Sequence, residues 1–271
     1  MKNIIILILV ASIGLNAGYI KESVEAHKKG EHKKVASIYQ KACDEGKASA
    51  CYNLGVLYMG SKGITTDTKK AIKFYKKACD AGFESSCYNL ALVYEKGKVV
   101  PKNMKKATKL YMKACTKNDG AACNNLGMIY RAKKDYKKAI DYYRKSCSSY
   151  DNVGCSNLAY MYEQGSGIKR NYKEAIKLYD KACKGGVAMA CSNLGHMYEN
   201  GSGMKKSYKK AIELYTKACD SKYARACNNL AILYVEAKGF KKADTKKAKE
   251  LFEKSCKLGL NTGCDNLKLI K

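Results

Sequence analysis

Cysteine pairs that recur at regular intervals constrain the fold of this chain more than any other feature. The sequence has 271 residues and 14 cysteines, which form seven pairs with members eight positions apart. The first members of successive pairs are 32 to 37 residues apart. The pairs are Cys43 with Cys51, Cys79 with Cys87, Cys115 with Cys123, Cys147 with Cys155, Cys183 with Cys191, Cys219 with Cys227 and Cys256 with Cys264. A fixed pattern with this period predicts a solenoid of stacked repeats.

Each repeat is predicted to be a pair of α-helices. An alanine or serine stands one position before the first cysteine, and an aromatic residue stands four before it. Leucine follows the second cysteine by three positions in every repeat, and glycine or alanine follows by four in six of them. Such steps of three and four place residues on one helical face. The aromatic residues are Tyr39, Tyr75, Tyr111, Tyr143, Tyr179, Tyr215 and Phe252. The fold class is therefore predicted to be all-α.

One repeat is shorter than the others. The segment between Cys115 and Cys147 lacks four residues, and its turn, "RAKKD" at 131–135, contains no glycine. We therefore expect a tighter connection between helices there than at the "GSKG" and "GSG" turns elsewhere.

The spacing of the cysteines separates three possible roles. Structural zinc sites favour cysteines two to four residues apart, and the chain has only three histidines. Redox-active pairs are usually of the Cys-x-x-Cys type. A cysteine at the end of one helix and another at the start of the next can instead reach disulfide distance. Each bridge would close a loop of about nine residues and stabilise the fold by about 2.6 kcal/mol. We predict seven disulfides, no metal and no cofactor.

The N-terminal segment predicts export. Residues 1–17 combine an early lysine, an apolar run and small residues near Ala17, the pattern of a cleaved signal peptide. A retained N-terminal anchor is the alternative. Disulfides persist in oxidising compartments, so we expect a periplasmic or secreted protein without a membrane span after cleavage. The predicted organisation is a signal peptide at 1–17, a capping helix at 18–31 and a repeat solenoid at 32–271.

The charge is strongly basic and consists mainly of lysine. The 52 Lys and Arg residues against 24 Asp and Glu residues give a net charge of +28. Only Arg131, Arg144, Arg170 and Arg225 are arginines. Because base-specific DNA readers depend on the bidentate arginine fork, nucleic acid is not an expected partner. A lysine-rich surface fits attraction to anionic envelope polymers, or solvated helix faces without a dedicated partner.

The recurrent pattern KKAIxxYxKACxxxxxxxCxNLGxxYxxGxG resembles the Sel1-like repeat, a relative of the tetratricopeptide repeat. With its cysteine pairs, the chain resembles the Helicobacter cysteine-rich proteins over about residues 19–271. The resemblance implies a right-handed superhelix of α/α hairpins, each tied by a disulfide, in an exported protein. That family has been associated with penicillin binding, with weak β-lactamase activity and with binding to host proteins.

The residues themselves give little support to a β-lactamase. Three Ser-x-x-Lys matches occur, Ser166–Lys169, Ser202–Lys205 and Ser207–Lys210, which is as many as chance predicts in so lysine-rich a chain. The Lys-Thr-Gly and Ser-Asp-Asn elements that serine β-lactamases also carry are absent. We therefore expect that the protein is not a dedicated hydrolase. Binding or hydrolysis of β-lactams stays an alternative that only the family resemblance supports.

An asparagine two positions after each second cysteine is the stronger candidate for a binding residue. Asparagine is a poor helix former, so its place inside every second helix needs a reason. In related tetratricopeptide arrays the matching asparagine lines the concave groove, where its amide holds an extended peptide. The alternative is a bond to a neighbouring repeat. The candidates are Asn53, Asn89, Asn125, Asn157, Asn193 and Asn229, and Asn266 holds the same position in the last repeat.

A lysine two positions before each first cysteine also recurs. In the last turn of a helix, a cation complements the helix dipole and the free carbonyls, so we expect a structural role. Binding of an acidic partner is the alternative. The lysines are Lys41, Lys77, Lys113, Lys145, Lys181, Lys217 and Lys254.

Together these patterns predict an exported, monomeric scaffold that binds proteins or extended peptides on its concave surface. A weak penicillin-binding protein or β-lactamase and a binder of anionic envelope polymers are the alternatives.

Overall fold

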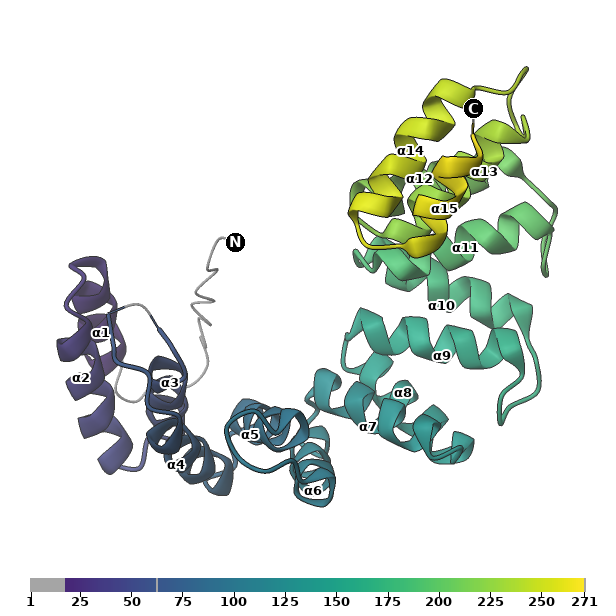
Figure 1. Cartoon of the computed structure of the whole chain (residues 1–271). Helices are drawn as coiled ribbons and strands as arrows, with labels where there is room; N and C mark the ends of the chain where they lie inside the picture. Colours follow the sequence, from purple (N-terminus) through teal and green to yellow (C-terminus); the bar gives the residue numbers. More distant parts are fainter. Residues whose placement is uncertain (1–17, 62, 271) are drawn as a thin grey trace. The chain divides into compact units, whose positions relative to one another are not determined.

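The computed structural model describes residues 18–61 and 63–270, and every regular element in that part of the chain is an α-helix (Figure 1). The expected signal peptide, at 1–17, lies outside the described residues. None of the described helices has the length and apolar character needed to span a bilayer. The all-α prediction is confirmed.

The helices follow the cysteine repeat, with one helical hairpin for each cysteine pair. Helix α1 (Gly18–Lys28) precedes the first hairpin. The hairpins are α2 (His32–Asp44) with α3 (Ala48–Tyr58), α4 (Thr68–Asp80) with α5 (Glu84–Lys96), α6 (Met104–Cys115) with α7 (Gly120–Ala132), α8 (Tyr136–Ser148) with α9 (Asn152–Gln164), α10 (Tyr172–Lys184) with α11 (Ala188–Asn200), α12 (Tyr208–Asp220) with α13 (Ala224–Val235), and α14 (Thr245–Lys257) with α15 (Asn261–Leu269).

The chain divides into two compact units. The first ends at Ala107 and the second begins at Thr108, so the division falls inside α6. The first unit contains α1 to α5, and the second contains α7 to α15.

Side-chain caps set the start of most first helices in the hairpins. The Asp67 carboxylate accepts a hydrogen bond from the backbone N–H of Lys70 at 3.0 Å. This bond is the main reason that the pKa of Asp67 lies below its usual value. Asn171 and Ser207 cap α10 and α12 in the same way. These side chains satisfy N–H groups that a helix start leaves without partners.

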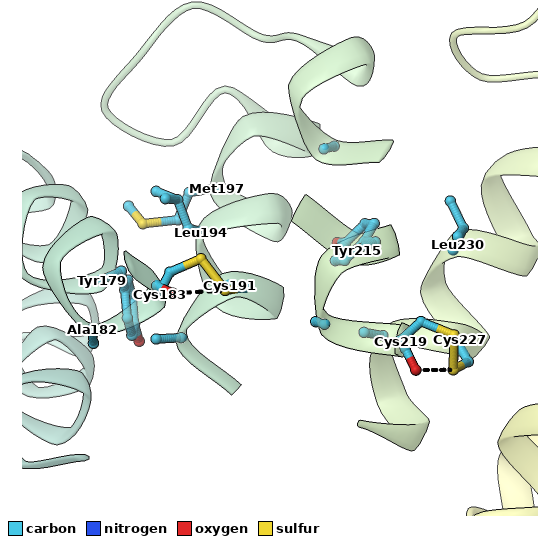
Figure 2. Close-up of a cluster of buried hydrophobic side chains, with 14 of the residues drawn as sticks. Tyr179, Ala182, Cys183, Cys191, Leu194, Met197, Tyr215, Cys219, Cys227 and Leu230 are labelled. Atoms are coloured by element: carbon cyan, nitrogen blue, oxygen red, sulfur yellow. Dashed lines mark hydrogen bonds between the residues drawn. A yellow bond between two sulfur atoms is a disulfide. The ribbon is translucent and has the colours of Figure 1, made fainter. Parts of the chain in front are cut away.

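Tyrosines and small residues interlock in the core of the second unit. Tyr179 and Tyr215 are completely buried, and Tyr179 lies beside the Cys183–Cys191 disulfide (Figure 2). A Cβ at Gly127 would lie 2.5 Å from the ring of Tyr143. The small residue four positions after the second cysteine therefore makes room for the aromatic residue of the next hairpin.

The same arrangement occurs in the first unit. Tyr75 is 3% exposed, and a Cβ at Gly55 would lie 2.5 Å from its ring. Phe74 and Leu54 pack near the Cys43–Cys51 disulfide.

The connection from α7 to α8 is the tight one that the sequence predicts. Only residues 133–135 separate these helices, whereas residues 59–67 separate α3 from α4. Lys134 takes a left-handed conformation with φ of 61°, in a turn that contains no glycine. The expected tighter connection is confirmed.

Candidate functional site

All fourteen cysteines lie within the described residues, where they form seven disulfides and none is free. The Cα atoms within each pair lie 4.5 to 4.9 Å apart, where the last turn of one helix meets the first turn of the next. The bridges join Cys43 to Cys51, Cys79 to Cys87, Cys115 to Cys123, Cys147 to Cys155, Cys183 to Cys191, Cys219 to Cys227, and Cys256 to Cys264. This is the pairing that the eight-residue spacing predicts.

The sulfur atoms are occupied within each hairpin. Sγ of Cys87 lies 3.6 Å from the carbonyl oxygen of Cys79, and Sγ of Cys155 lies 3.7 Å from that of Cys147. Cys87 is 1% exposed and Cys155 is completely buried. The cysteines therefore link helices and leave no thiolate for catalysis or metal binding.

The second helices of neighbouring hairpins carry the recurrent asparagines on faces that meet. In the second unit, α7 contacts α9, α11 contacts α13, and α13 contacts α15. The Asn157 amide donates a hydrogen bond to Oδ1 of Asn124 at 2.7 Å, and Asn266 donates to Asn228 at 2.9 Å. The expected alternative, a bond to a neighbouring repeat, therefore holds at Asn157. The six candidate asparagines are all partly exposed.

In other hairpins the asparagine contacts a buried tyrosine of its own hairpin. Asn193 bonds to the hydroxyl of Tyr179, which donates to Oε2 of Glu163 at 2.7 Å. Glu163 belongs to the preceding hairpin. The bond lies among partly exposed groups at the edge of the core, where an Asn amide retains a second N–H and a carbonyl oxygen. We call an asparagine, a buried tyrosine and a glutamate of the preceding hairpin that are connected in this way a tyrosine relay.

The next hairpin repeats the relay. Asn229 bonds to the hydroxyl of Tyr215, which donates to Oε2 of Glu199 at 2.7 Å. Burial is the main reason that the pKa values of Tyr179 and Tyr215 lie far above the usual range, and the glutamates raise them further. Both hydroxyls therefore stay protonated and act as donors. In the first unit, Asn89 bonds to Tyr75.

An exposed apolar row runs beside the asparagines. Its members lie five positions after the second cysteine and three after the asparagine, in the hairpins where this position is both apolar and exposed. Met128 and Tyr160 are 41% and 40% exposed, and Val56 is exposed in the first unit. We call the recurrent asparagines and the exposed apolar side chains of the second unit together the asparagine face. Sequence reasoning missed the apolar row, although its fixed spacing was a readable signal.

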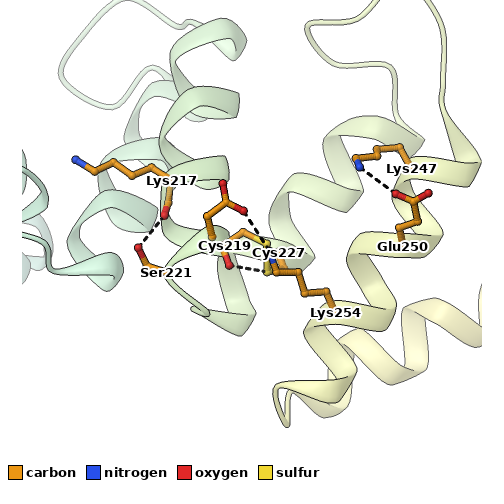
Figure 3. A network of polar contacts seen from close by, with 8 residues as sticks. Lys217, Cys219, Ser221, Cys227, Lys247, Glu250 and Lys254 are labelled. Atoms are coloured by element: carbon orange, nitrogen blue, oxygen red, sulfur yellow. Dashed lines mark hydrogen bonds and ion pairs between the residues drawn. A yellow bond between two sulfur atoms is a disulfide. The ribbon is translucent and has the colours of Figure 1, made fainter. Parts of the chain in front are cut away.

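Several of the recurrent lysines bind the preceding hairpin. Lys181 donates to the carbonyl oxygen of Cys147 at 3.2 Å, and Lys217 donates to that of Cys183 at 3.3 Å. Lys254 pairs with Asp220 at 3.2 Å (Figure 3). The prediction of a structural role is correct at these positions. The carbonyls and carboxylates belong to the end of the first helix one hairpin earlier, because stacking brings adjacent helix ends together.

The serines of the Ser-x-x-Lys matches belong to turns and caps. Ser207 is the N-cap of α12 and accepts a bond from the backbone N–H of Lys210 at 3.4 Å. Ser166 and Ser202 donate their backbone N–H groups to Met161 and Met197 at the ends of α9 and α11. Ser166 and Ser202 therefore lie in corresponding turns, and Ser207 lies at a helix start.

The Sel1 repeat profile matches residues 48–83, 84–119, 153–187, 188–223 and 224–260. The chain belongs to the Sel1 repeat family. A tetratricopeptide repeat profile matches residues 120–148, within the shortened repeat. Among curated protein sequences, none matches the chain.

Several solved structures resemble this Sel1 repeat protein. A Sel1 repeat protein from Oxalobacter formigenes is 25% identical, with a TM-score of 0.80, over 89% of this chain and 97% of its own. A putative sel1 repeat protein from Klebsiella pneumoniae is 22% identical, with a TM-score of 0.51, over 73% of this chain and 98% of its own. Cysteine rich protein B of Helicobacter pylori is 27% identical over 60% of this chain and 95% of its own, with a TM-score of 0.26. The first two matches agree with the repeat fold.

Proposed function

We propose that this Sel1 repeat protein is a binding scaffold whose asparagine face holds extended segments of other proteins. Sel1 and tetratricopeptide repeats generally mediate protein–protein interactions, and the chain consists mostly of such repeats. The observation that carries the proposal is the pairing of two rows on one face. Partly exposed amides stand next to side chains such as Met128 and Tyr160, which expose about two fifths of their surface.

The chemistry of the two rows fits a peptide backbone with apolar side chains. An amide donates and accepts, as a peptide bond requires, so an asparagine row can bond to successive backbone groups of an extended segment. Exposed apolar side chains at fixed intervals offer contacts to alternate side chains of the same segment. The inner bonds to tyrosine hydroxyls hold the Asn193 and Asn229 amides in place before a ligand arrives, which lowers the entropic cost of binding.

The proposal is tested with peptides selected from a random displayed library on the immobilised full chain. Binding of the selected peptides to the wild type and to N193A/N229A is then measured by calorimetry. We expect the double variant to bind about tenfold more weakly or worse, because it loses two or more hydrogen bonds. Undiminished affinity of every selected peptide for N193A/N229A would refute the proposal.

The matched control separates the inner role of the asparagines from the outer one. Y179F/Y215F removes the hydroxyls that Asn193 and Asn229 contact and leaves both amides in place. We expect this variant to melt at a lower temperature and to lose clearly less peptide affinity than N193A/N229A, since both amides remain on the asparagine face but are held less firmly. If N193A/N229A and Y179F/Y215F lost the same amount of peptide affinity, the asparagines would act only by stabilising the fold and not by contacting the peptide.

We also propose that the protein acts outside the cytoplasm, in the periplasm or after secretion, with residues 1–17 as signal peptide, 18–31 as capping segment and 32–271 as repeat solenoid. The seven disulfides support this because such bonds persist in oxidising compartments. Expression in a Gram-negative host with N-terminal sequencing is the test. An N-terminus at Gly18 in the exported fraction is expected, and full-length cytoplasmic protein with reduced thiols would contradict it.

A further inference from the structure

The hairpin of α8 and α9 lacks the tyrosine relay of the two hairpins that follow it. Tyr143 holds the position of Tyr179 and Tyr215 and is completely buried like them. Its hydroxyl, however, has no hydrogen-bond partner within the described part of the chain. A buried hydroxyl without a partner costs about 1–3 kcal/mol, so its presence requires an explanation.

Both of the usual partners are missing for specific reasons. The asparagine of this hairpin, Asn157, donates instead to Asn124 at 2.7 Å. The glutamate of the preceding hairpin is replaced, because the residue eight positions after Cys123 is Arg131. The same position holds Glu163 and Glu199 in the hairpins that follow. An arginine has no acceptor atom to offer a hydroxyl.

Arg131 is placed where a carboxylate would complete the relay. Its side chain is exposed, and its guanidinium carbon lies 5.8 Å from the ring centroid of Tyr160. Among the described residues its guanidinium makes no ion pair. Burial raises the pKa of Tyr143, and the positive charge of Arg131 acts against this rise. Met128 lies three positions before Arg131 on α7, and both Met128 and Tyr160 are exposed apolar side chains.

We propose that Arg131 and Tyr143 form a site for a carboxylate from a partner protein. The carboxylate pairs with the Arg131 guanidinium and accepts the hydrogen bond of the Tyr143 hydroxyl, as Glu163 does from Tyr179. The source is a glutamate or aspartate side chain or a free C-terminus, next to an apolar residue that contacts Met128 or Tyr160. The proposal rests on the proposed binding function of the asparagine face, and the net charge of +28 favours acidic partners.

The test uses two small carboxylates and arginine-specific NMR. Because the chain has only four arginines, a sample labelled with ¹⁵N-arginine gives four side-chain Nε–H signals. Propionate imitates an acidic side chain, and N-acetylglycinate imitates a C-terminus. We expect one or both to shift the Arg131 signal saturably and more than those of Arg144, Arg170 and Arg225. Sodium chloride at equal ionic strength should not reproduce this shift. The carboxylate that binds more tightly identifies the source.

Two variants connect the signal to the site, and each is expected to fold. Y143F removes only the partnerless hydroxyl and should weaken carboxylate binding about tenfold. R131E supplies the carboxylate from the chain itself and should raise the melting temperature by about 2–4 °C. That rise should vanish when R131E is combined with Y143F, which controls for the change in net charge.

Equal small shifts of all four arginine signals, or unchanged carboxylate affinity in Y143F, would overturn the proposal. A rise in melting temperature from R131E that persists in Y143F would overturn it as well, because the hydroxyl would then have no part. These measurements do not involve Asn193 or Asn229. Carboxylate binding can therefore succeed or fail independently of the peptide experiment.

Discussion

At the scale of single residues, tyrosine hydroxyls link two hairpins of the second unit to the hairpins before them. The tyrosines that follow Glu163 and Glu199 donate to these carboxylates across the hairpin boundary. Where the corresponding position is Val235, the next aromatic residue is Phe252, which has no hydroxyl and is 3% exposed. At these three boundaries tyrosine follows glutamate and phenylalanine follows valine, which avoids the cost of a buried hydroxyl without an acceptor.

This pairing can be tested with a double-mutant cycle at the α13–α14 boundary. F252Y introduces a buried hydroxyl opposite Val235, and Asn266 is already bonded to Asn228. We expect F252Y to lower the free energy of unfolding by about 1–3 kcal/mol. Adding V235E supplies the acceptor and should recover about 1 kcal/mol or more as coupling between the two sites. Urea unfolding of all four proteins gives the coupling energy, and a value near zero would show that the relay contributes nothing there.

Sequence reasoning found the residues of the relay but not their bonds. The aromatic row and the asparagine row are readable because each recurs in every repeat. Asn157 bonds to Asn124 and not to Tyr143, which depends on how two hairpins stack. The periodicity of the sequence carries no information on that stacking. The same holds for the lysines, whose carbonyl partners lie one hairpin away.

At the scale of helices and hairpins, the disulfides differ chiefly in burial. Cys183, Cys191, Cys219 and Cys227 are at most 3% exposed, because a further hairpin covers each of these bridges. Cys256 and Cys264 lie in the last hairpin and are partly exposed. Thiol–disulfide exchange needs access of a thiolate to sulfur, so burial should set the order in which the bridges open.

We therefore predict that Cys256–Cys264 is the first of the second unit's bridges to be reduced under native conditions. Brief treatment with dithiothreitol, trapping with iodoacetamide and peptide mapping by mass spectrometry would give the order. Removing this bridge in C256A/C264A should cost about 2.6 kcal/mol or less by the chain-entropy relation, since it closes a loop of about nine residues. Earlier labelling of Cys183 or Cys219 than of Cys256 would contradict the argument from burial. Reduction in denaturant, where burial is lost, serves as the control.

The helices themselves were predictable, because alternation of large and small apolar residues at steps of three and four leaves no other regular structure. The tight turn after α7 was also predictable, since four missing residues must come out of a connection. The exposed apolar row was harder to recognise, because its residue type varies between repeats. Five positions after the second cysteine, two repeats have Met128 and Tyr160, and another has the polar His196.

At the scale of the whole molecule, the core depends on neutral tyrosines. Most globular cores are built mainly from aliphatic side chains, whereas here Tyr111, Tyr143, Tyr179 and Tyr215 are the largest fully buried side chains. Stability is therefore tied to a group that ionises at high pH. Burial raises the pKa values of Tyr75, Tyr143, Tyr179 and Tyr215 above the usual value near 10.

The protein should therefore lose stability steeply as the pH rises above 10. Below pH 10 both the folded and unfolded states hold these phenolic protons, so the contribution of the four tyrosines is fully present. Above pH 10 the unfolded chain loses the protons while the folded chain keeps them, so the free energy of unfolding falls as pH rises. Each such tyrosine contributes a slope of roughly 1.4 kcal/mol per pH unit until its own raised pKa is reached.

A jump to pH 11 tests this coupling between ionisation and unfolding. We expect at least four of the 22 tyrosines to give no phenolate absorbance at 295 nm immediately after the jump. They should ionise only as helical circular dichroism is lost, because the folded core keeps their protons. Stopped-flow mixing completes the measurement before alkali can cleave disulfides. Immediate ionisation of all 22 tyrosines with helicity intact would show that the core tyrosines are open to solvent.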